Sequence, residues 1–333
     1  MTDLEVLLDF CGARMRVIAD DDSWLKPFHR AFPDFMADGP SGADEFLLTI
    51  EETDTPAIAH DLPLTYDGPM ADGQVGKIFE SESSSIMEIE DGGTVVIDHG
   101  AHTAHARLRP GSTRFYGSPM MTVIDAALVA AGQQMVHAAS LIDERSGKAI
   151  LFCVPSGGGK TTTSLALAHG GFKLMTDDAS ILVPKKNGFD VWGMPRALKV
   201  HVKTADLLPW VGPLEDKWDE NGEQDVKISD LAGRISVAEP GPVELGAIVL
   251  IGPRSPSGHT VTPVAKPEIL VALAHDNVAW RQAGMTPKAL RAFAVFSRAV
   301  AGVPTFKLSA GTDLAILPDV LNEALRHLPE KAR

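Results

Sequence analysis

Residues 154–162 read VPSGGGKTT, a glycine-rich stretch that ends in a lysine and two threonines. Before it, AILFCV at 149–154 is a short apolar run typical of a buried strand. After it, TTTSLALAHGG at 161–171 has the pattern of an amphipathic helix that ends at a glycine pair. Consecutive glycines let several backbone N–H groups point at one anion, and the start of the helix adds its dipole. The sequence therefore predicts a phosphate-binding loop between a strand and a helix.

This stretch matches the P-loop (Walker A) pattern G-x-x-x-x-G-K-[ST] at Gly159, Lys160 and Thr161, and departs from it at Val154. A lysine in this position reaches the β- and γ-phosphates of a nucleotide, and the next hydroxyl ligates Mg²⁺. The expected nucleotide-binding residues are those of the loop and the first helical turn: Ser156, Gly157, Gly158, Gly159, Lys160, Thr161 and Thr162. The alternative is a glycine-rich turn that happens to end in Lys-Thr, and the flanking strand and helix argue against it.

An aspartate pair, Asp177 and Asp178, ends the next apolar segment, KLMTDD at 173–178. We expect this segment to be a strand beside the AILFCV strand, with its carboxyl end facing the phosphates. Adjacent strand residues point to opposite sides, so the two carboxylates are expected to have different roles. One can hold a metal ion, and the other can accept the proton of an incoming hydroxyl. The alternative is a pair of turn-forming, helix-capping aspartates.

Three segments together resemble a known family: HAASL at 137–141, SGKAILFCVPSGGGKTT at 146–162 and GGFKLMTDDASILV at 170–183. They are similar to the core of HPr kinase/phosphorylase and of the wider group of HPr-kinase-like serine kinases. The resemblance covers residues 120–320 and is most specific in the loop and the aspartate pair. It implies an α/β fold with a P-loop nucleotide-binding core of the HPr kinase/phosphoenolpyruvate carboxykinase type. It also implies ATP and Mg²⁺ as cofactors and phosphoryl transfer to a serine hydroxyl.

The resemblance also implies roles for residues that match the family by position. Asp178 becomes the catalytic base, whereas Asp177, with Thr161, becomes the metal-binding side of the pair. Lys160 becomes the catalytic phosphate clamp. His137 becomes an active-site neighbour that hydrogen-bonds the carboxylate or the γ-phosphate, and the alternative for it is a satisfied core histidine.

The chain departs from this family after the aspartate pair. Where the family has a glutamate-bearing segment, this chain reads GMPRALKVHV at 193–202, which contains no acid. Arg196 follows a proline and, with Lys199, is a candidate for contact with the transferring phosphoryl group or an acidic substrate. An ordinary basic strand is the alternative. HPr itself is therefore not the expected acceptor.

These features lead to an expected function and to alternatives from other classes. We expect an ATP- and Mg²⁺-dependent serine kinase-like enzyme that phosphorylates a serine-like hydroxyl of a protein or peptide. A kinase for a small-molecule hydroxyl is a close variant. A catalytically inactive nucleotide-binding regulatory protein is the main alternative, because the first glycine and the metal-binding glutamate are missing. A carboxykinase ranks third, because the sequence shows no site for an oxaloacetate-like substrate.

Length and composition set the domain organisation and the class of partner. The 333 residues suffice for two domains, and we expect a small mixed α/β recognition or assembly domain at 1–118 and the kinase domain at 119–333. A net charge of −14 disfavours nucleic acid as a partner. The acidic start of the chain and the lack of a long apolar run predict a cytoplasmic protein without membrane contact. The polar segment 215–230 is expected to be a loop, and family relatives suggest a homo-oligomer.

Overall fold

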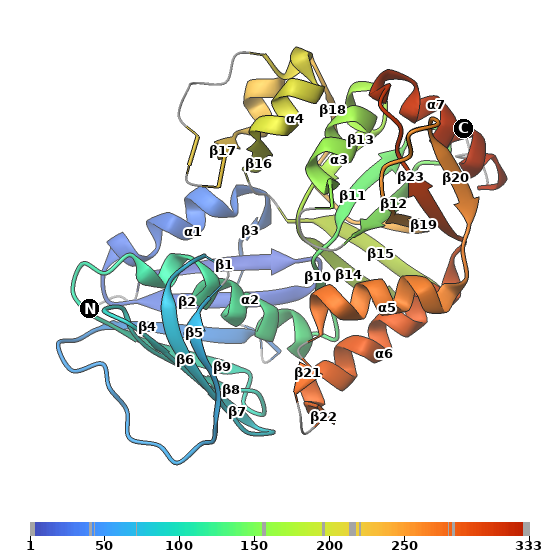
Figure 1. Cartoon of the computed structure of the whole chain (residues 1–333). Helices are drawn as coiled ribbons and strands as arrows, with labels where there is room; N and C mark the ends of the chain where they lie inside the picture. The colour runs from blue at the N-terminus through green and yellow to red at the C-terminus, as the bar shows by residue number, and fades with distance from the viewer. Residues whose placement is uncertain are drawn as a thin grey trace. The chain divides into compact units, whose positions relative to one another are not determined.

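The protein is described by a computed structural model that covers residues 4–39, 42, 44–70, 72–154, 158–194, 197–212, 218–219, 221–278, 280–281 and 284–328. The chain forms two compact units, Met1–Gln133 and Gln134–Arg333, and each has its own large mixed sheet (Figure 1). The expected boundary after residue 118 falls at the start of helix α2 (Ser118–Ala130), whereas the observed division follows the helix. No helix among the described residues is both long and apolar enough to cross a membrane.

The first unit is built on a nine-stranded sheet with the order β3-β1-β2-β4-β9-β8-β7-β6-β5. Its strands are β1 (Leu4–Phe10), β2 (Ala13–Ala19), β3 (Met36–Ala37), β4 (Phe46–Glu52), β5 (Leu64–Pro69), β6 (Val75–Glu80), β7 (Ser84–Ile89), β8 (Gly93–Asp98) and β9 (Thr103–Leu108). Strand β4 pairs in parallel with β2 and β9, and the other pairs are antiparallel.

Helix α2 packs on β2, β4 and β8 of this sheet, and a second helix, α1 (Lys26–Ala31), precedes β3. The alternation in β4 explains the packing, because Phe46, Leu48 and Ile50 are buried while the residues between them are only partly so. Aromatic side chains complete the core at the end of β1, where the rings of Phe10 and Phe35 lie 4.7 Å apart. The unit thus buries one sheet face with short helices and aromatic rings.

The second unit is built on a ten-stranded sheet whose main path is β10-β14-β15-β19-β12-β11-β13-β18. The strands of this path are β10 (Gln134–Val136), β11 (Ala139–Asp143), β12 (Lys148–Cys153), β13 (Lys173–Thr176), β14 (Ser180–Lys185), β15 (Gly188–Gly193), β18 (Ser236–Val237) and β19 (Val243–Ile251). Two more strands, β20 (Thr260–Pro263) and β23 (Thr305–Ser309), join it through the β19–β23 pair. Small two-stranded sheets are formed by β16 (Leu198–His201) with β17 (Glu223–Val226) and by β21 (Trp280–Arg281) with β22 (Gly284–Met285).

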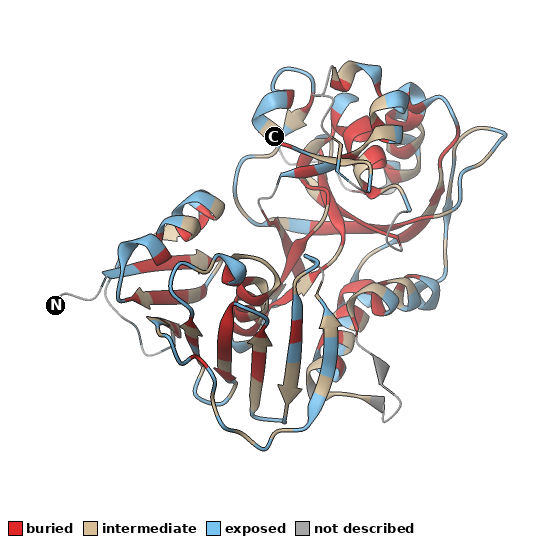
Figure 2. Cartoon of the chain, turned by 60° about the vertical axis from the view of Figure 1, so that its left-hand side comes forward, coloured by how far each residue is buried: buried red, intermediate tan, exposed pale blue. Residues whose placement is uncertain are grey.

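Helices cover both faces of this sheet, as Figure 1 shows. They are α3 (Lys160–His169), α4 (Val202–Leu207), α5 (Lys266–Asn277), α6 (Pro287–Gly302) and α7 (Leu317–Ala324). Ile150 and Phe152 of β12 pack in the same core cluster as α3 and α7, whereas Leu151 between them packs with α5 and α6. Burial on both faces explains why this strand is an unbroken apolar run in the sequence, and Figure 2 shows buried residues concentrated on the strands.

The order of the strands differs from the expectation in one respect that matters for the site. The KLMTDD strand, β13, does not pair with β12, because β11 lies between them and pairs antiparallel with both. Two antiparallel steps restore the direction, so β12 and β13 run the same way and end at the same edge of the sheet. The predicted common edge is therefore present, although the predicted direct pairing is wrong.

Two further segments differ from their expected structure. The polar segment 215–230 is not simply a loop, because its residues Glu223–Val226 form β17 and pair with β16. Near the end of the chain, β23 lies between α6 and α7 and adds a parallel neighbour to β19. In both cases pairing with a distant strand decides the structure of a segment whose own pattern is weak.

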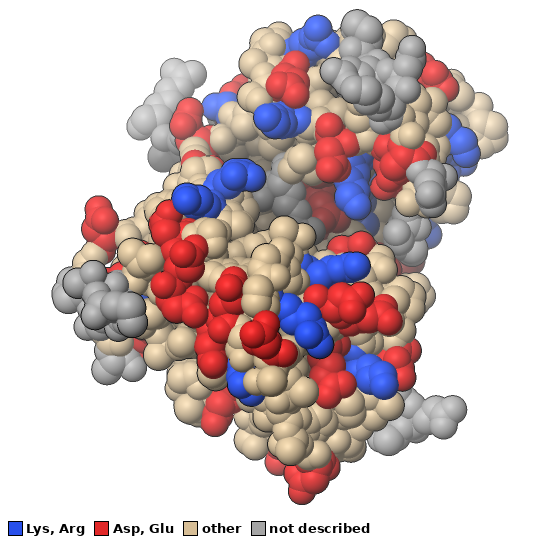
Figure 3. All heavy atoms as spheres, turned by 90° about the vertical axis from the view of Figure 1, so that its left-hand side faces the viewer, with Lys and Arg blue, Asp and Glu red and all other residues tan. Residues whose placement is uncertain are grey.

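Charged side chains of both signs are spread over the surface. On the face drawn in Figure 3, Lys and Arg are interspersed with more widely distributed Asp and Glu, in keeping with the net charge of −14. The described residues on that face form no continuous basic patch.

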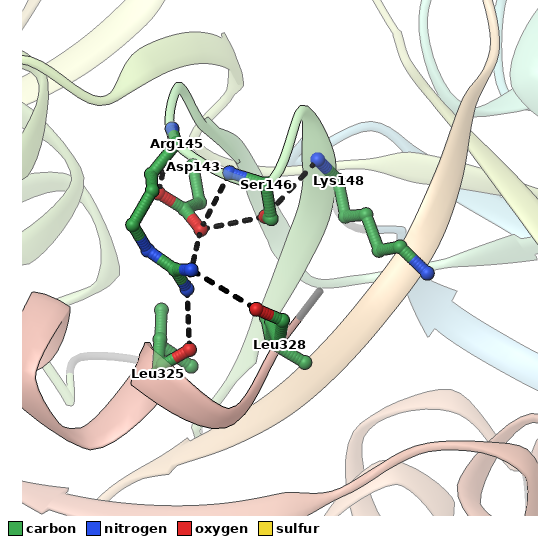
Figure 4. A network of polar contacts seen from close by, with 6 residues as sticks. All are labelled: Asp143, Arg145, Ser146, Lys148, Leu325 and Leu328. Carbon is green, nitrogen blue, oxygen red and sulfur yellow. Dashed lines mark hydrogen bonds and ion pairs between the residues drawn. The ribbon is translucent and has the colours of Figure 1, made fainter. Parts of the chain in front are cut away.

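A polar network anchors the C-terminal turn of the second unit to the β11–β12 hairpin (Figure 4). The guanidinium of Arg145 donates to the carbonyls of Leu325, at 2.5 Å, and Leu328, at 3.0 Å. Asp143 lies 3.5 Å from the same guanidinium and accepts a 2.6 Å hydrogen bond from the Ser146 hydroxyl. Carbonyls at the end of a helical segment lack partners within it, so Arg145 supplies donors that this turn needs.

Candidate functional site

The glycine loop, defined here as residues 154–159, connects β12 to α3. Ser156 and Gly157, which the sequence places in the phosphate cradle, and Pro155 before them lie outside the described residues. Gly159 has φ +93°, a left-handed conformation that favours glycine, and no described side chain caps the ten-residue helix that follows. The first backbone N–H groups of α3 are therefore available to an anion in front of the helix.

Lys160 begins this helix, and its side chain reaches back to Val154, the residue that follows β12. The ammonium donates to the carbonyl of Val154 at 3.2 Å, and the residue is only 9% exposed. Burial lowers the pKa of the ammonium, and nearby anionic groups oppose that shift. The carboxylates among them are, in order of strength, Asp276, Asp178 and Asp177. Lys160 is therefore a partly desolvated cation among three carboxylates.

Thr161 and Asp177 form the buried part of the site. The Thr161 hydroxyl donates to Oδ2 of Asp177 at 2.6 Å, and Asp177 is only 4% exposed. Burial raises the pKa of Asp177 to about 6; the hydrogen bond from Thr161 opposes this rise, and the charge of Asp178 adds to it. The pair brings two hard oxygen atoms together at the start of α3.

Asp178 lies beside Asp177 in sequence but in a different environment. Its Oδ1 is 3.1 Å from Nε2 of His137, and both side chains are about two-fifths exposed, at 40% and 39%. The backbone N–H of His137 in turn donates to Oδ1 of Asn277 at 2.5 Å. The half-exposed carboxylate is thus held by an imidazole that faces solvent, and it can accept a proton from an incoming group.

Asp177 and Asp178 therefore contact different partners. Both residues follow β13 rather than ending it, so the strand alternation on which the prediction rests does not apply to them. His137 lies just before β11 instead of opening the strand. The structure brings Lys160, Thr161, Asp177, Asp178 and His137 to one edge of the sheet.

The remaining predicted residues do not join this group in the described structure. The hydroxyl of Thr162 lies 2.7 Å from that of Thr204 on α4, and both residues are buried, so it faces a neighbouring helix. Lys199 is exposed on β16, opposite Asp225. Arg196 lies outside the described residues.

Sequence reasoning missed the end of α5, where Asp276 and Asn277 reach the site from more than a hundred positions away. The segment KPEILVALAHD shows the helical pattern, but an acid in its last turn carries no local sign of a partner in a distant loop. The indication in the sequence is that the helix dipole disfavours an acid at the C-terminal end of a helix, and this does not identify its partner.

No group of three or more His, Cys, Asp or Glu side chains in the described part of the chain is arranged to hold a metal ion. The chain matches no protein-family model, and a search of curated proteins found no match. Among solved structures, it is similar to the Hpr(Ser) kinase/phosphatase from Coxiella burnetii, with a TM-score of 0.29 and 16% identity. That match covers 58% of this chain and 94% of the other. It is a remote resemblance.

Proposed function

We propose that the second unit is an ATP- and Mg²⁺-dependent phosphotransferase that moves the γ-phosphate to a serine-like hydroxyl of a protein or peptide. The observation that carries this proposal is the division of the aspartate pair. Asp177 is buried against the Thr161 hydroxyl, whereas Asp178 is half-exposed against His137. A nucleotide-binding site alone has no use for the second arrangement, and a hydroxyl phosphotransferase needs both.

The residues present fit a nucleotide phosphate with Mg²⁺. Gly159 and the uncapped start of α3 provide backbone donors, and the ammonium of Lys160 lies within the same turn. Mg²⁺ retains water and takes one or two protein oxygens plus phosphate oxygens, so Thr161 and Asp177 would hold it. Bound there, the ion would neutralise charge on the phosphates.

The chain's own residues then account for the transfer. Lys160 binds the phosphates, and Asp178 accepts the proton of the acceptor hydroxyl as that oxygen bonds to the γ-phosphorus. The bond from the γ-phosphorus to its bridging oxygen breaks, and ADP leaves. His137 keeps the Asp178 carboxylate oriented and takes no part in bond making.

Nucleotide binding is tested first, by thermal unfolding with and without ATP and Mg²⁺. A ligand that binds only the folded state raises Tm, and we expect Lys160→Ala to lose most of that rise. Lys173→Ala, which removes a lysine that pairs with Glu144 elsewhere in the unit, is the matched control and should keep it. Equal stabilisation of parent and Lys160→Ala would refute the nucleotide site.

Transfer is tested with radiolabelled ATP and a cell extract as the source of acceptors. Asp178→Asn keeps the shape and removes the base, so we expect label incorporation to fall by roughly 10²–10⁴-fold while ATP affinity is kept. Asp206→Asn, on the exposed side of α4, should transfer like the parent. Equal transfer by Asp178→Asn would remove the base assignment. ATP binding without transfer to any acceptor, metabolites included, would favour a nucleotide-binding regulatory protein.

A further inference from the structure

His137 lies in the turn between β10 and β11, and backbone groups on either side of it are held by hydrogen bonds. The N–H of Ala138 donates to the carbonyl of Val136 at 2.9 Å. The carbonyl of Ala138 accepts a 3.0 Å hydrogen bond from the hydroxyl of Ser180, which is fully buried and follows Asp178 by two residues. This bond therefore holds together the two chain segments that carry His137 and Asp178.

Asn277, the last residue of α5, contacts the same turn from a distant part of the chain. Its Oδ1 accepts the backbone N–H of His137 at 2.5 Å, and its Nδ2 donates to the carbonyl of Leu273 at 2.9 Å. The oxygen of the amide thus faces a donor and its nitrogen faces an acceptor. The reverse orientation would bring two donors together and two oxygens together, so the contacts fix the amide. Because α5 packs on β12 and β19, Asn277 ties the turn to the sheet.

The turn in turn determines where the imidazole of His137 lies. Its Nε2 is 3.1 Å from Oδ1 of Asp178, and the two side chains are 39% and 40% exposed. Packing around such exposed groups is incomplete, so the ring depends on the backbone from which it projects. A displacement of about 1 Å at a reacting group can lower a rate by about 10²-fold. The support of the His137 backbone therefore bears on the base.

We propose that Asn277 is a positioning residue of the transfer reaction. It fixes the backbone of His137, so that His137 keeps the carboxylate of Asp178 directed at the acceptor hydroxyl. This role rests on the proposed function, whereas the contact itself does not. The two hydrogen bonds of the Asn277 side chain go to His137 and Leu273, and neither goes to the glycine loop. Asn277 therefore acts on the rate of transfer and not on the binding of nucleotide.

The first test is Asn277→Leu, which removes both hydrogen bonds and keeps a side chain of similar size. The initial rate of label incorporation from radiolabelled ATP into cell-extract protein, at saturating ATP and Mg²⁺, should fall by roughly 10–10²-fold. The Kd for ATP with Mg²⁺ should change by no more than about twofold. In a His137→Ala background the same substitution should have no further effect, because no ring remains to be positioned. Asn322→Leu, the same change on α7, is the control and should keep the parental rate.

Asn277→Asp separates positioning of His137 from a role in ending the helix. It keeps an oxygen for the His137 N–H, removes the donor to the Leu273 carbonyl and adds a charge that the C-terminal end of a helix disfavours. We expect a lower Tm and a transfer rate within about threefold of the parent. If this variant loses as much rate as Asn277→Leu, the helix end is what matters and the inference is wrong.

A measurement without nucleotide separates this inference from the proposed function. With histidine labelled with ¹³C at Cε1, the signal of His137 among the 11 histidines is identified by its loss in His137→Ala. Asp178→Asn should displace that signal in the parent, because the carboxylate lies 3.1 Å from the ring, and should displace it much less in Asn277→Leu.

Equal displacements in the two backgrounds would overturn the inference, as would additive rate losses in the double variant of His137 and Asn277. If the parent transfers no phosphate to any acceptor, the proposed function fails. The NMR comparison then decides alone whether Asn277 positions His137.

Discussion

Replacing Asp177 with asparagine tests whether the buried charge of this carboxylate lowers the stability of the folded protein. Asp177 is 4% exposed, and burial raises the pKa of its carboxyl from an ordinary 3.8 to about 6. Asparagine has the same shape, and its Oδ1 still accepts the hydrogen bond from Thr161. The substitution therefore removes the charge and keeps the contact.

The direction of the pKa shift determines how the contribution of Asp177 to stability changes with pH. Between pH 3.8 and about 6 the folded protein holds a proton on Asp177 that the unfolded chain has lost. The contribution of the protonated carboxyl to stability is fully present below that window and is lost as the pH rises through about 6. Each pKa unit is worth about 1.4 kcal/mol, so the charged form costs about 3 kcal/mol above the window. At pH 4.5 the same calculation gives a destabilisation by Asp177 of only about 1 kcal/mol.

We therefore expect Asp177→Asn to stabilise the nucleotide-free protein at pH 7.5. With roughly 2–4 °C per kcal/mol for a unit of this size, Tm in EDTA should rise by about 6–12 °C at pH 7.5 and by only a few degrees at pH 4.5. The exposed control, Asp206→Asn, should show no such dependence on pH. The same variant should also show a weaker effect of Mg²⁺ on ATP binding. A lower Tm at pH 7.5, or the same gain at both pH values, would refute the argument.

Two further predictions concern packing beside the site. Thr162→Val leaves the buried hydroxyl of Thr204 without its 2.7 Å partner and should cost about 1–3 kcal/mol, whereas the double valine variant should cost less than the two single changes together, as urea unfolding would show. Gly170→Ala places a Cβ 2.1 Å from Cγ of Pro318 and should lower stability by about 1–3 kcal/mol through displacement of α7 from α3; Gly302→Ala, which meets nothing within 4 Å, is its control. Additive valine effects, or equal stability of the two alanine variants, would contradict these contacts.

The parts of the fold that follow from local pattern were predictable from the sequence. β12 is apolar on both faces, and α3 ends at its glycine pair. Both features are determined by residues that are neighbours in the sequence. That Asp177 and Asp178 have different contacts was also expected, although both residues follow β13 and alternation within the strand does not account for it.

What could not be predicted depends on contacts between distant segments. The insertion of β11 between β12 and β13 is decided by register with both neighbours. β17 forms because β16 offers it a partner, and its own residues are mostly polar. The Thr162 hydroxyl is directed by α4, which no motif links to the glycine loop. In each case contacts between distant segments, rather than local propensity, determine the structure.

Several charged residues gather at this edge of the sheet, although burial or helix position disfavours their charges. One ammonium, Lys160, is surrounded by three carboxylates, two of them largely buried and one of these at the disfavoured end of a helix. With all four groups ionised, two negative charges remain in excess before any phosphate arrives. A nucleotide alone would increase that excess, whereas a nucleotide accompanied by a divalent cation would not. Under the proposed function, the dependence on Mg²⁺ would then come from the whole carboxylate set, and Lys160 would contribute to phosphate binding without making the site neutral. A site that binds only an anion would be weakened by these acids, because each carboxylate repels phosphate.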